Sequence, residues 1–396
     1  MSMTMQKQAI AIAVAGAFAA PVPAMAQSTS AVQVYGNLYL EYSFASQDRA
    51  NNGVDAADVD LLQTPGSSIG FKGEEKLGGG LSAWFQCEST ADVRGITGGG
   101  FCSRNSAVGL KGGFGNLFVG VWDTPFKRTL STGNVGGRTS GIFGTAFLLG
   151  VNSTTTTDGA SPGVFVRRQR NLISYDSPRF GGFQALAAFS STNSSTATTG
   201  SSAGAKPRVW SLGGTYKAGA LDLGAAYERH TKAYPNVAQP GLATFAGDEE
   251  GYHLSAAYRI GPVKFGGIYT QQEADTAAAA TAEVKVWHLG VEWKVAGPHN
   301  LHFGYTEADD VTGTAGGPAI GGGGATSRPS AGGDTGAKLY QIRYLYEFSK
   351  RTTGTIGYVN LKNDSRAAYD LGGLSYPNAA SGAKQSAIAL SVQHRF

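Results

Sequence analysis

The chain has 396 residues, of which 15% are charged and 10% aromatic, with 58 glycines, 14 prolines and a formal net charge of +4. Low charge and abundant aromatic residues exclude a chain kept disordered by charge repulsion, and the sequence has no Lys/Arg block that would indicate a nucleic-acid partner. Glycine is about twice as frequent as in ordinary soluble domains, without the three-residue period of collagen.

An export signal is predicted over residues 1–26. Lys7 precedes an apolar run at 9–20, and residues 24–26 read Ala-Met-Ala. A positive start, a short apolar run and a small-residue cleavage site are typical of a secretory signal peptide. The run has about 12 residues, fewer than the ~20 that a membrane-spanning helix needs. We therefore expect residues 27–396 to form the mature, exported chain.

Beyond this segment, apolar and polar residues alternate with a period of two. Between 32 and 44, Leu38 and Tyr42 occupy the apolar positions, whereas Asn37 and Glu41 occupy the polar ones. This spacing predicts β-strands with one apolar and one polar face. The pattern predicts sixteen strands, over 32–44, 67–75, 81–92, 104–111, 115–123, 167–177, 183–190, 208–217, 221–230, 251–260, 263–272, 284–295, 299–307, 338–349, 352–362 and 385–396.

Short and long connections take turns between these strands. Connections after even-numbered strands have a few residues, as at 261–262, whereas those after odd-numbered strands are long and polar, as at 45–66 and 308–337. Outer-membrane barrels sort their connections in this way, and the alternative, a large soluble β-protein, has no reason to do so. We therefore predict an all-β fold, a 16-stranded antiparallel transmembrane β-barrel with short periplasmic turns and long external loops.

Lipid determines which face of each strand points outward. A Lys or Arg that faces lipid at mid-depth costs ~2–4 kcal/mol, so the apolar face is expected outside and the polar face in the lumen. Tyr252 and Tyr258 share the outer face and suit the two aromatic belts. A lumen enclosed by about sixteen strands is too wide for side chains to fill, which predicts an aqueous channel.

The longest connection, about 124–166, is the predicted constriction. Its apolar side chains, such as Phe143 and Leu148, favour packing against the inner wall over an ordinary surface loop with a hydrophobic cluster. No Asp or Glu lies between Asp123 and Asp158. The segment therefore carries positive charge alone over this stretch.

Basic residues on this segment and on the strands facing it are the candidate selectivity residues. Arg and Lys at a constriction favour anions, and a narrow passage focuses their field. Acids on the lumen face would cancel this preference if the charges paired. We expect anion preference. The candidates are Lys127, Arg128 and Arg138 in the constriction loop and Arg104, Arg168, Arg170 and Lys72 on the pore-lining basic wall.

Several short motifs follow one another along the chain in an order and spacing that match a known family. They are Val34-Tyr35-Gly36, Ile69-Gly70-Phe71-Lys72-Gly73, Leu77-Gly78-Gly79-Gly80-Leu81, Val108-Gly109-Leu110-Lys111, Ser174-Tyr175-Asp176-Ser177-Pro178, Tyr346-Glu347-Phe348-Ser349-Lys350-Arg351-Thr352 and the final His394-Arg395-Phe396. In these stretches the chain resembles the general porins of Gram-negative outer membranes, especially their β-proteobacterial trimeric branch.

The resemblance implies a homotrimer in outer-membrane lipid that lets small hydrophilic solutes and ions diffuse passively, with the third external loop folded into the pore. It implies that terminal Phe396 is read by the barrel-insertion machinery, and that Arg104 and Arg170 are basic wall residues. Two departures stand out. Ser68 occupies a position where an arginine is common, and the stretch at 120–122, Gly-Val-Trp, replaces the usual Gly-Arg-Gln.

Catalytic and metal-binding signals are weak. The G-x-S-x-G pattern at 200–204 lies in a Ser/Thr/Gly/Ala stretch rather than between a strand and a helix. His299 and His302 lie on one predicted strand and point to opposite faces. We expect no enzyme, cofactor or metal. Cys87 and Cys102 lie across a hairpin and are expected to form a disulfide, the alternative being two free thiols.

Other functions remain open for such a barrel. A substrate-specific outer-membrane channel for organic anions would have the same sequence features as a general porin. A non-conducting surface adhesin or structural barrel would use its long external loops for binding. An outer-membrane lipase or protease would need a Ser/His/acid cluster at the barrel rim, and the sequence has no such constellation.

Overall fold

The computed structural model describes residues 32–48, 58–95, 100–150, 164–191, 208–231, 248–275, 280–314, 331–372 and 381–396. The predicted signal peptide and the G-x-S-x-G motif lie outside these ranges. Among the described residues, no helix is long and apolar enough to cross a membrane.

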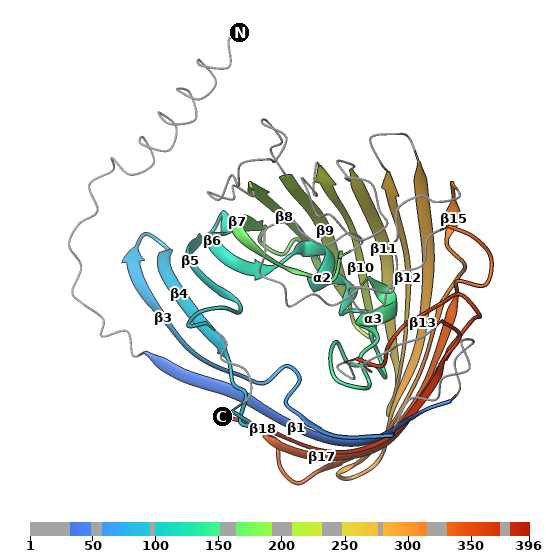
Figure 1. Ribbon diagram of the computed structural model, residues 1–396. Coiled ribbons are helices and arrows are strands. Elements are labelled where there is room, and N and C mark those ends of the chain that lie inside the picture. The colour runs from blue at the N-terminus through green and yellow to red at the C-terminus, as the bar shows by residue number, and fades with distance from the viewer. Residues whose placement is uncertain are drawn as a thin grey trace.

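One antiparallel sheet curls until its first strand meets its last, as Figure 1 shows. β1 (Gln33–Gln47) pairs with β18 (Lys384–Arg395) in a continuous register from Asn37–Arg395 to Gln47–Gln385. Closure matters because an open edge would leave backbone N–H and C=O groups unpaired in lipid.

Sixteen long strands form the closed wall, as predicted. Each pairs with the next one around the barrel, and β14 pairs directly with β16. Besides β1 and β18 they are β3 (Ser68–Gly78), β4 (Leu81–Thr90), β5 (Ser106–Gly112), β6 (Gly115–Asp123), β7 (Arg168–Asp176), β8 (Phe183–Ser191), β9 (Arg208–Ala218), β10 (Leu221–Thr231), β11 (Glu249–Ile260), β12 (Val263–Asp275), β13 (Thr281–Ala296), β14 (His299–Ala308), β16 (Ala337–Glu347) and β17 (Thr352–Asn363).

Two further short strands add pairings to this closed wall. β15 (Thr312–Gly313) adds two residues beside β13. β2 (Val59–Gln63) pairs with residues 41–45 of β1, and β3 pairs with residues 33–37 of the same strand. Pro65 lies between them and has no N–H to donate to the ladder.

Ser67 repairs the ladder where β2 and β3 are interrupted. Its Oγ accepts a hydrogen bond from the Tyr39 N–H at 2.9 Å and donates one to the Tyr39 carbonyl oxygen at 3.0 Å. One serine side chain thus satisfies both backbone groups of Tyr39, which has a strand partner on β18 but none on the side of β2 and β3.

Exposure alternates along the strands as the sequence predicts. On β1, Tyr42 and Phe44 are 40% and 49% exposed on the outer face, whereas Tyr39 and Glu41 are 1% and 0% exposed on the lumen side. Tyr258 on β11 is likewise exposed outside. The polar face is buried in many places because a segment of the chain covers it from within.

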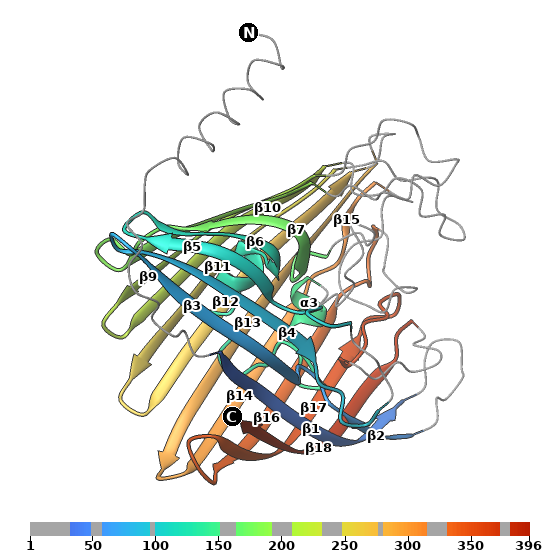
Figure 2. The ribbon, with the colours of Figure 1, turned by 90° about the vertical axis from the view of Figure 1, so that its left-hand side faces the viewer.

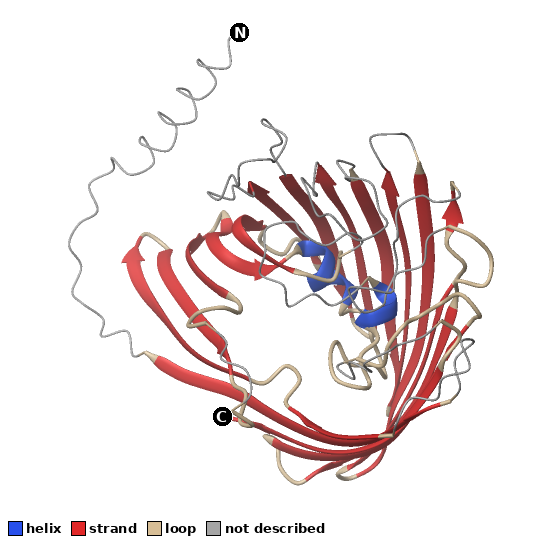
Figure 3. Ribbon diagram, in the orientation of Figure 1, coloured by secondary structure: helices blue, strands red, loops and turns tan. Residues whose placement is uncertain are grey.

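The short turns gather at one end of the barrel, as Figure 2 shows. An example is the two-residue turn 261–262 between β11 and β12. Helices α2 (Pro125–Leu130) and α3 (Ala146–Leu149) lie inside the ring of strands (Figure 3). They belong to the long connection between β6 and β7.

Candidate channel constriction

The connection that follows β6 turns directly into the lumen. The Thr124 Oγ1 accepts a hydrogen bond from the Lys127 N–H at 3.5 Å and caps α2, and Pro125 opens the first turn of the helix. Proline suits this position because the first helical N–H groups have no partner within the helix. The chain therefore leaves the sheet within one residue and starts a helix inside the barrel.

Helix α2 packs against the inner faces of β9, β10 and β11. Phe126 and Leu130 are fully buried there. The His253 Nε2 atom on β11 lies 3.0 Å from the Phe126 carbonyl oxygen, and the Ser255 hydroxyl donates to the Thr129 carbonyl oxygen at 3.0 Å. Side chains of the wall thus satisfy carbonyl groups of the helix.

The middle of the segment crosses β12 to β16 in direct contact with their backbone. The His288 Nε2 atom lies 2.9 Å from the Val135 carbonyl oxygen. Arg343, only 3% exposed, donates to the Gly136 carbonyl oxygen at 2.7 Å. A Cβ at Gly290 would collide with the Val135 carbonyl group, so only glycine allows this approach.

The far end of the segment is tied to β1. The guanidinium carbon of Arg138 lies 3.7 Å from the centre of the Tyr39 ring, a cation–π contact. The Ile142 N–H donates to Glu41 Oε1 at 3.0 Å, and the Tyr39 hydroxyl donates to the same carboxylate at 2.8 Å. Glu41 is fully buried, so these donors take the place of water around its carboxyl oxygens.

The apolar residues of the segment, which the sequence analysis noted as unusual, face the wall. Phe143 and Leu149 are 0% exposed, and Leu148 is 1% exposed. The Gln272 side chain of β12 donates to the Leu149 carbonyl oxygen at 2.7 Å. The described parts of the segment, 124–150 and 164–166, therefore have their hydrophobic side chains buried inside the barrel.

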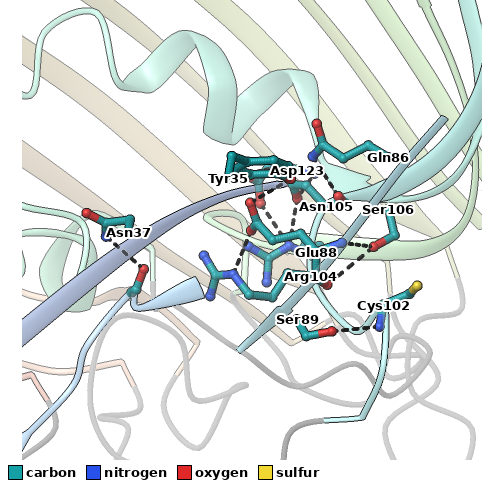
Figure 4. A network of polar contacts seen from close by, with 12 residues as sticks. Tyr35, Asn37, Gln86, Glu88, Ser89, Cys102, Arg104, Asn105, Ser106 and Asp123 are labelled. Carbon is teal, nitrogen blue, oxygen red and sulfur yellow. Dashed lines mark hydrogen bonds and ion pairs between the residues drawn. The ribbon is translucent and has the colours of Figure 1, made fainter. Parts of the chain in front are cut away.

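A network of charged side chains lies on the wall formed by β4 to β7. Arg104 pairs with Glu88 at 2.7 Å, and the Tyr35 hydroxyl donates to the same carboxylate at 3.2 Å. Figure 4 shows these side chains turned toward one another, together with Asn105 and Asp123. The Arg168 Nε donates to Asn105 Oδ1 at 2.7 Å.

Lys127 joins this network from α2. Its Nζ lies 2.9 Å from Asp123 Oδ1, and the Arg168 Nε lies 3.5 Å from the same oxygen. Burial lowers the pKa of Lys127, and the repulsion of Arg168 acts in the same direction, although the Asp123 carboxylate opposes both. One carboxylate is thus shared between two cations.

Three of the four other assigned basic residues, Arg128, Lys72 and Arg138, have different environments. Arg128 forms a bidentate pair with Asp176, at 2.8 and 2.6 Å. Lys72 lies 5.1 Å from the centre of the Tyr35 ring. Neither Lys72 nor Arg138 forms an ion pair with another described residue.

Arg170 lies at an irregularity that the alternation rule does not foresee. The register between β6 and β7 shifts between Gly120 and Trp122, and Asn171 has φ of 50°, in the left-handed region. Arg170 is exposed and makes no ion pair with the rest of the described chain. The alternation of inward and outward side chains along β7 therefore does not determine which way Arg170 points. Its assignment to the basic wall stays a prediction.

Two other predictions concern residues away from the segment. Cys87 and Cys102 are joined by a disulfide, with Cα atoms 4.7 Å apart. Phe396 closes the sheet, because its N–H donates to the Gly36 carbonyl oxygen at 3.2 Å and its own carbonyl accepts from the Gly36 N–H at 3.1 Å.

His302 lies 3.8 Å from Glu292, and no group of metal ligands occurs among the described residues.

Sequence reasoning did not assign Arg343 or Glu41 a role in holding the segment. Both lie on the lumen face of strands with clear alternation, so their direction was predictable. Their partners were not, because backbone groups of 136 and 142 carry no sequence signal. A charged residue at a lumen position opposite a long inward loop is the only hint available.

A model of the Gram-negative porin family matches residues 9–366 of this chain. The chain belongs to this family. It is an outer-membrane porin and forms a channel. The porin is 27% identical over 375 residues to outer membrane porin protein 32 of Delftia acidovorans, covering 94% of this chain and 95% of the relative. It is 35% identical over 213 residues to the major outer membrane protein P.IB of Neisseria meningitidis serogroup B, covering 52% of this chain and 56% of that protein.

Solved structures agree with the fold of the porin. The anion-selective porin from Comamonas acidovorans superposes with a TM-score of 0.70 at 23% identity, covering 93% of this chain and all of that one. OmpT of Vibrio cholerae in its trimer form has a TM-score of 0.62 at 15% identity, covering 93% of this chain and 99% of that one.

Proposed function

We propose that this porin is an anion-preferring diffusion channel for small hydrophilic solutes, constricted by the segment 124–166 between the basic wall and the opposite strands. The observation that carries the proposal is the charge balance among the assigned residues. Three carboxylates, Glu88, Asp123 and Asp176, pair with four of the seven cations. The cations therefore outnumber the acids paired with them, which favours anions in a narrow passage.

The experiment is the reversal potential across a planar bilayer under a KCl gradient. The proposal predicts a reversal potential with the sign that a chloride-preferring pore gives. Replacing Arg104 and Arg170 by Ala should weaken that preference without unfolding the barrel. A potassium-preferring sign would contradict anion selectivity, and an unchanged preference in the double variant would contradict the wall assignment.

We also propose a homotrimer, and Phe396 as the residue that the insertion machinery reads. The trimer form of a similar barrel supports the first, and the pairing of Phe396 with Gly36 directly after the closing strand supports the second. Chemical cross-linking in the outer membrane should yield a species of three chains. Deleting Phe396 should lower the amount of inserted barrel, whereas Gln393→Ala on the same strand should not.

A further inference from the structure

Three aromatic side chains meet on the lumen side of β4 and β6. The ring centroids of Trp84, Phe118 and Trp122 lie 5.2 to 5.8 Å apart, in tilted or edge-to-face contact. Their strand neighbours Phe85 and Val119 are 39% and 51% exposed on the outer face. The three rings, called here the aromatic patch, therefore face the lumen rather than lipid.

A glycine on β5 makes room for the aromatic patch on the wall. A Cβ at Gly109 would lie 2.6 Å from Trp84 Nε1 and 2.7 Å from Phe118 Cβ. The indole of Trp84 can therefore lie across β5, beside the rings from β6.

The two indoles of the patch remain partly open to the channel. Phe118 is only 2% exposed because the rings of Trp84 and Trp122 pack on it, whereas both tryptophans are themselves half-buried. The Trp84 N–H donates to Asn116 Oδ1 at 2.7 Å, so its polar edge is satisfied. The surface that Trp84 leaves to a solute is therefore its ring rather than a free N–H group.

Cations lie immediately next to the patch along the same strands. Trp122 pairs with Gln169, and the next pair in the register is Asp123 with Arg168. Arg104, Lys127 and Arg168 share the carboxylates of Glu88 and Asp123, three positive charges against two negative ones. The cluster is partly exposed, with side-chain accessibilities of 9 to 19%.

We propose that the aromatic patch and these three cations form a binding subsite for aromatic monocarboxylates on their way through the channel. The ring of the solute stacks on the Trp84 and Trp122 indoles, and its carboxylate faces the cation cluster with its excess positive charge. Binding of this kind is weak and reversible, as conduction requires. The inference rests on the proposed function, because the solute reaches the patch only through an open lumen.

The test is block of the chloride current through the full-length porin in planar bilayers. Benzoate added to one side should reduce the current at concentrations where acetate and benzyl alcohol, which lack the ring and the charge respectively, do not. Trp84→Ala and Trp122→Ala should each raise the half-blocking concentration about tenfold, through loss of a ring contact. Trp84→Phe keeps a ring and should keep most of the block.

Trp287→Ala is the matched control, since Trp287 is 48% exposed on the outer face. It should leave benzoate block unchanged. Equal block by benzoate and acetate in a conducting, chloride-preferring channel would overturn the subsite and leave the proposed function intact. Absence of conductance in KCl alone would instead overturn the proposed function.

Fluorescence gives a second readout, which needs no variant. Trp210, Trp287 and Trp293 are exposed on the outer face and meet lipid, whereas the two indoles of the patch meet water. In vesicles, acrylamide in the aqueous phase should quench the fluorescence of the two patch indoles. Benzoate should reduce this quenching, whereas acetate should not. Quenching that benzoate does not change would contradict binding at the patch.

Discussion

The carbonyl oxygen of Val135 occupies the place where a side chain on Gly290 would begin. This contact sets how close the inward segment lies to β13, because His288 on the same strand holds the same oxygen at 2.9 Å. The width of the channel is therefore linked to a residue of the wall that has no side chain.

Gly290→Val should push the segment away from the wall and toward the lumen. We expect lower single-channel conductance and a loss of about 1–3 kcal/mol in stability, the usual cost of overpacking. Planar-bilayer recording and urea unfolding in detergent measure the two effects. Gly267→Ala is the control, because its Cβ would make only ordinary contacts with Leu289 and the His288 backbone, the nearest at 3.4 Å. Unchanged conductance in Gly290→Val would show that the contact does not set the width.

Removing the disulfide should destabilise the barrel without altering its channel. The bond closes a loop with a sequence separation of 15, for which the chain-entropy model gives about 3 kcal/mol. The Cys87→Ser/Cys102→Ser variant should unfold at lower urea concentration and keep its conductance. A reductant should have the same effect on the natural protein and none on the variant. Identical unfolding curves for the two proteins would refute a stabilising role.

A charge on the outer face should cost more in the middle of a strand than near its end. Leu254 and Tyr258 lie on one face of β11 and are 62% and 49% exposed. Leu254→Arg should lose ~2–4 kcal/mol in bilayers, and Tyr258→Arg, nearer the interface, about 0–1 kcal/mol. Refolding titrations in lipid vesicles measure the difference. Equal costs would mean that Leu254 does not face the hydrocarbon layer.

Anion preference should fall at alkaline pH, in part through Lys127. Burial lowers its pKa, so it loses its proton at a lower pH than a free lysine, and the positive charge that helps select anions disappears with it. The reversal potential measured between about pH 7 and about pH 10 should shift toward zero selectivity. Lys127→Arg stays charged over this range and should shift less. An identical shift in both proteins would exclude Lys127 as its source.

Alternation along the strands was enough to predict the barrel. The faces of β1, for example, follow from the period of two, because lipid accepts Tyr42 and Phe44 but not Glu41. Strand ends agree with the prediction to within a few residues, since turn glycines and the loss of alternation mark them. β2 and the break at Pro65 lie within 45–66, which the sequence analysis assigned to a loop, so β2 was not predicted.

The charge partners were decided only by the tertiary structure. Lys127 follows Asp123 by one helical turn, but Arg168 reaches the same carboxylate from β7. Arg128 pairs with Asp176 at a sequence separation of 48, so only the folded barrel brings these groups together. The same holds for Trp84 on β4, whose ring meets Phe118 on β6. The period of two depends on each residue's own face toward lipid or water, whereas these contacts depend on the register between strands distant in sequence. The amino-acid sequence alone therefore determined the architecture, and the folded barrel determined which of its charges and rings a solute meets.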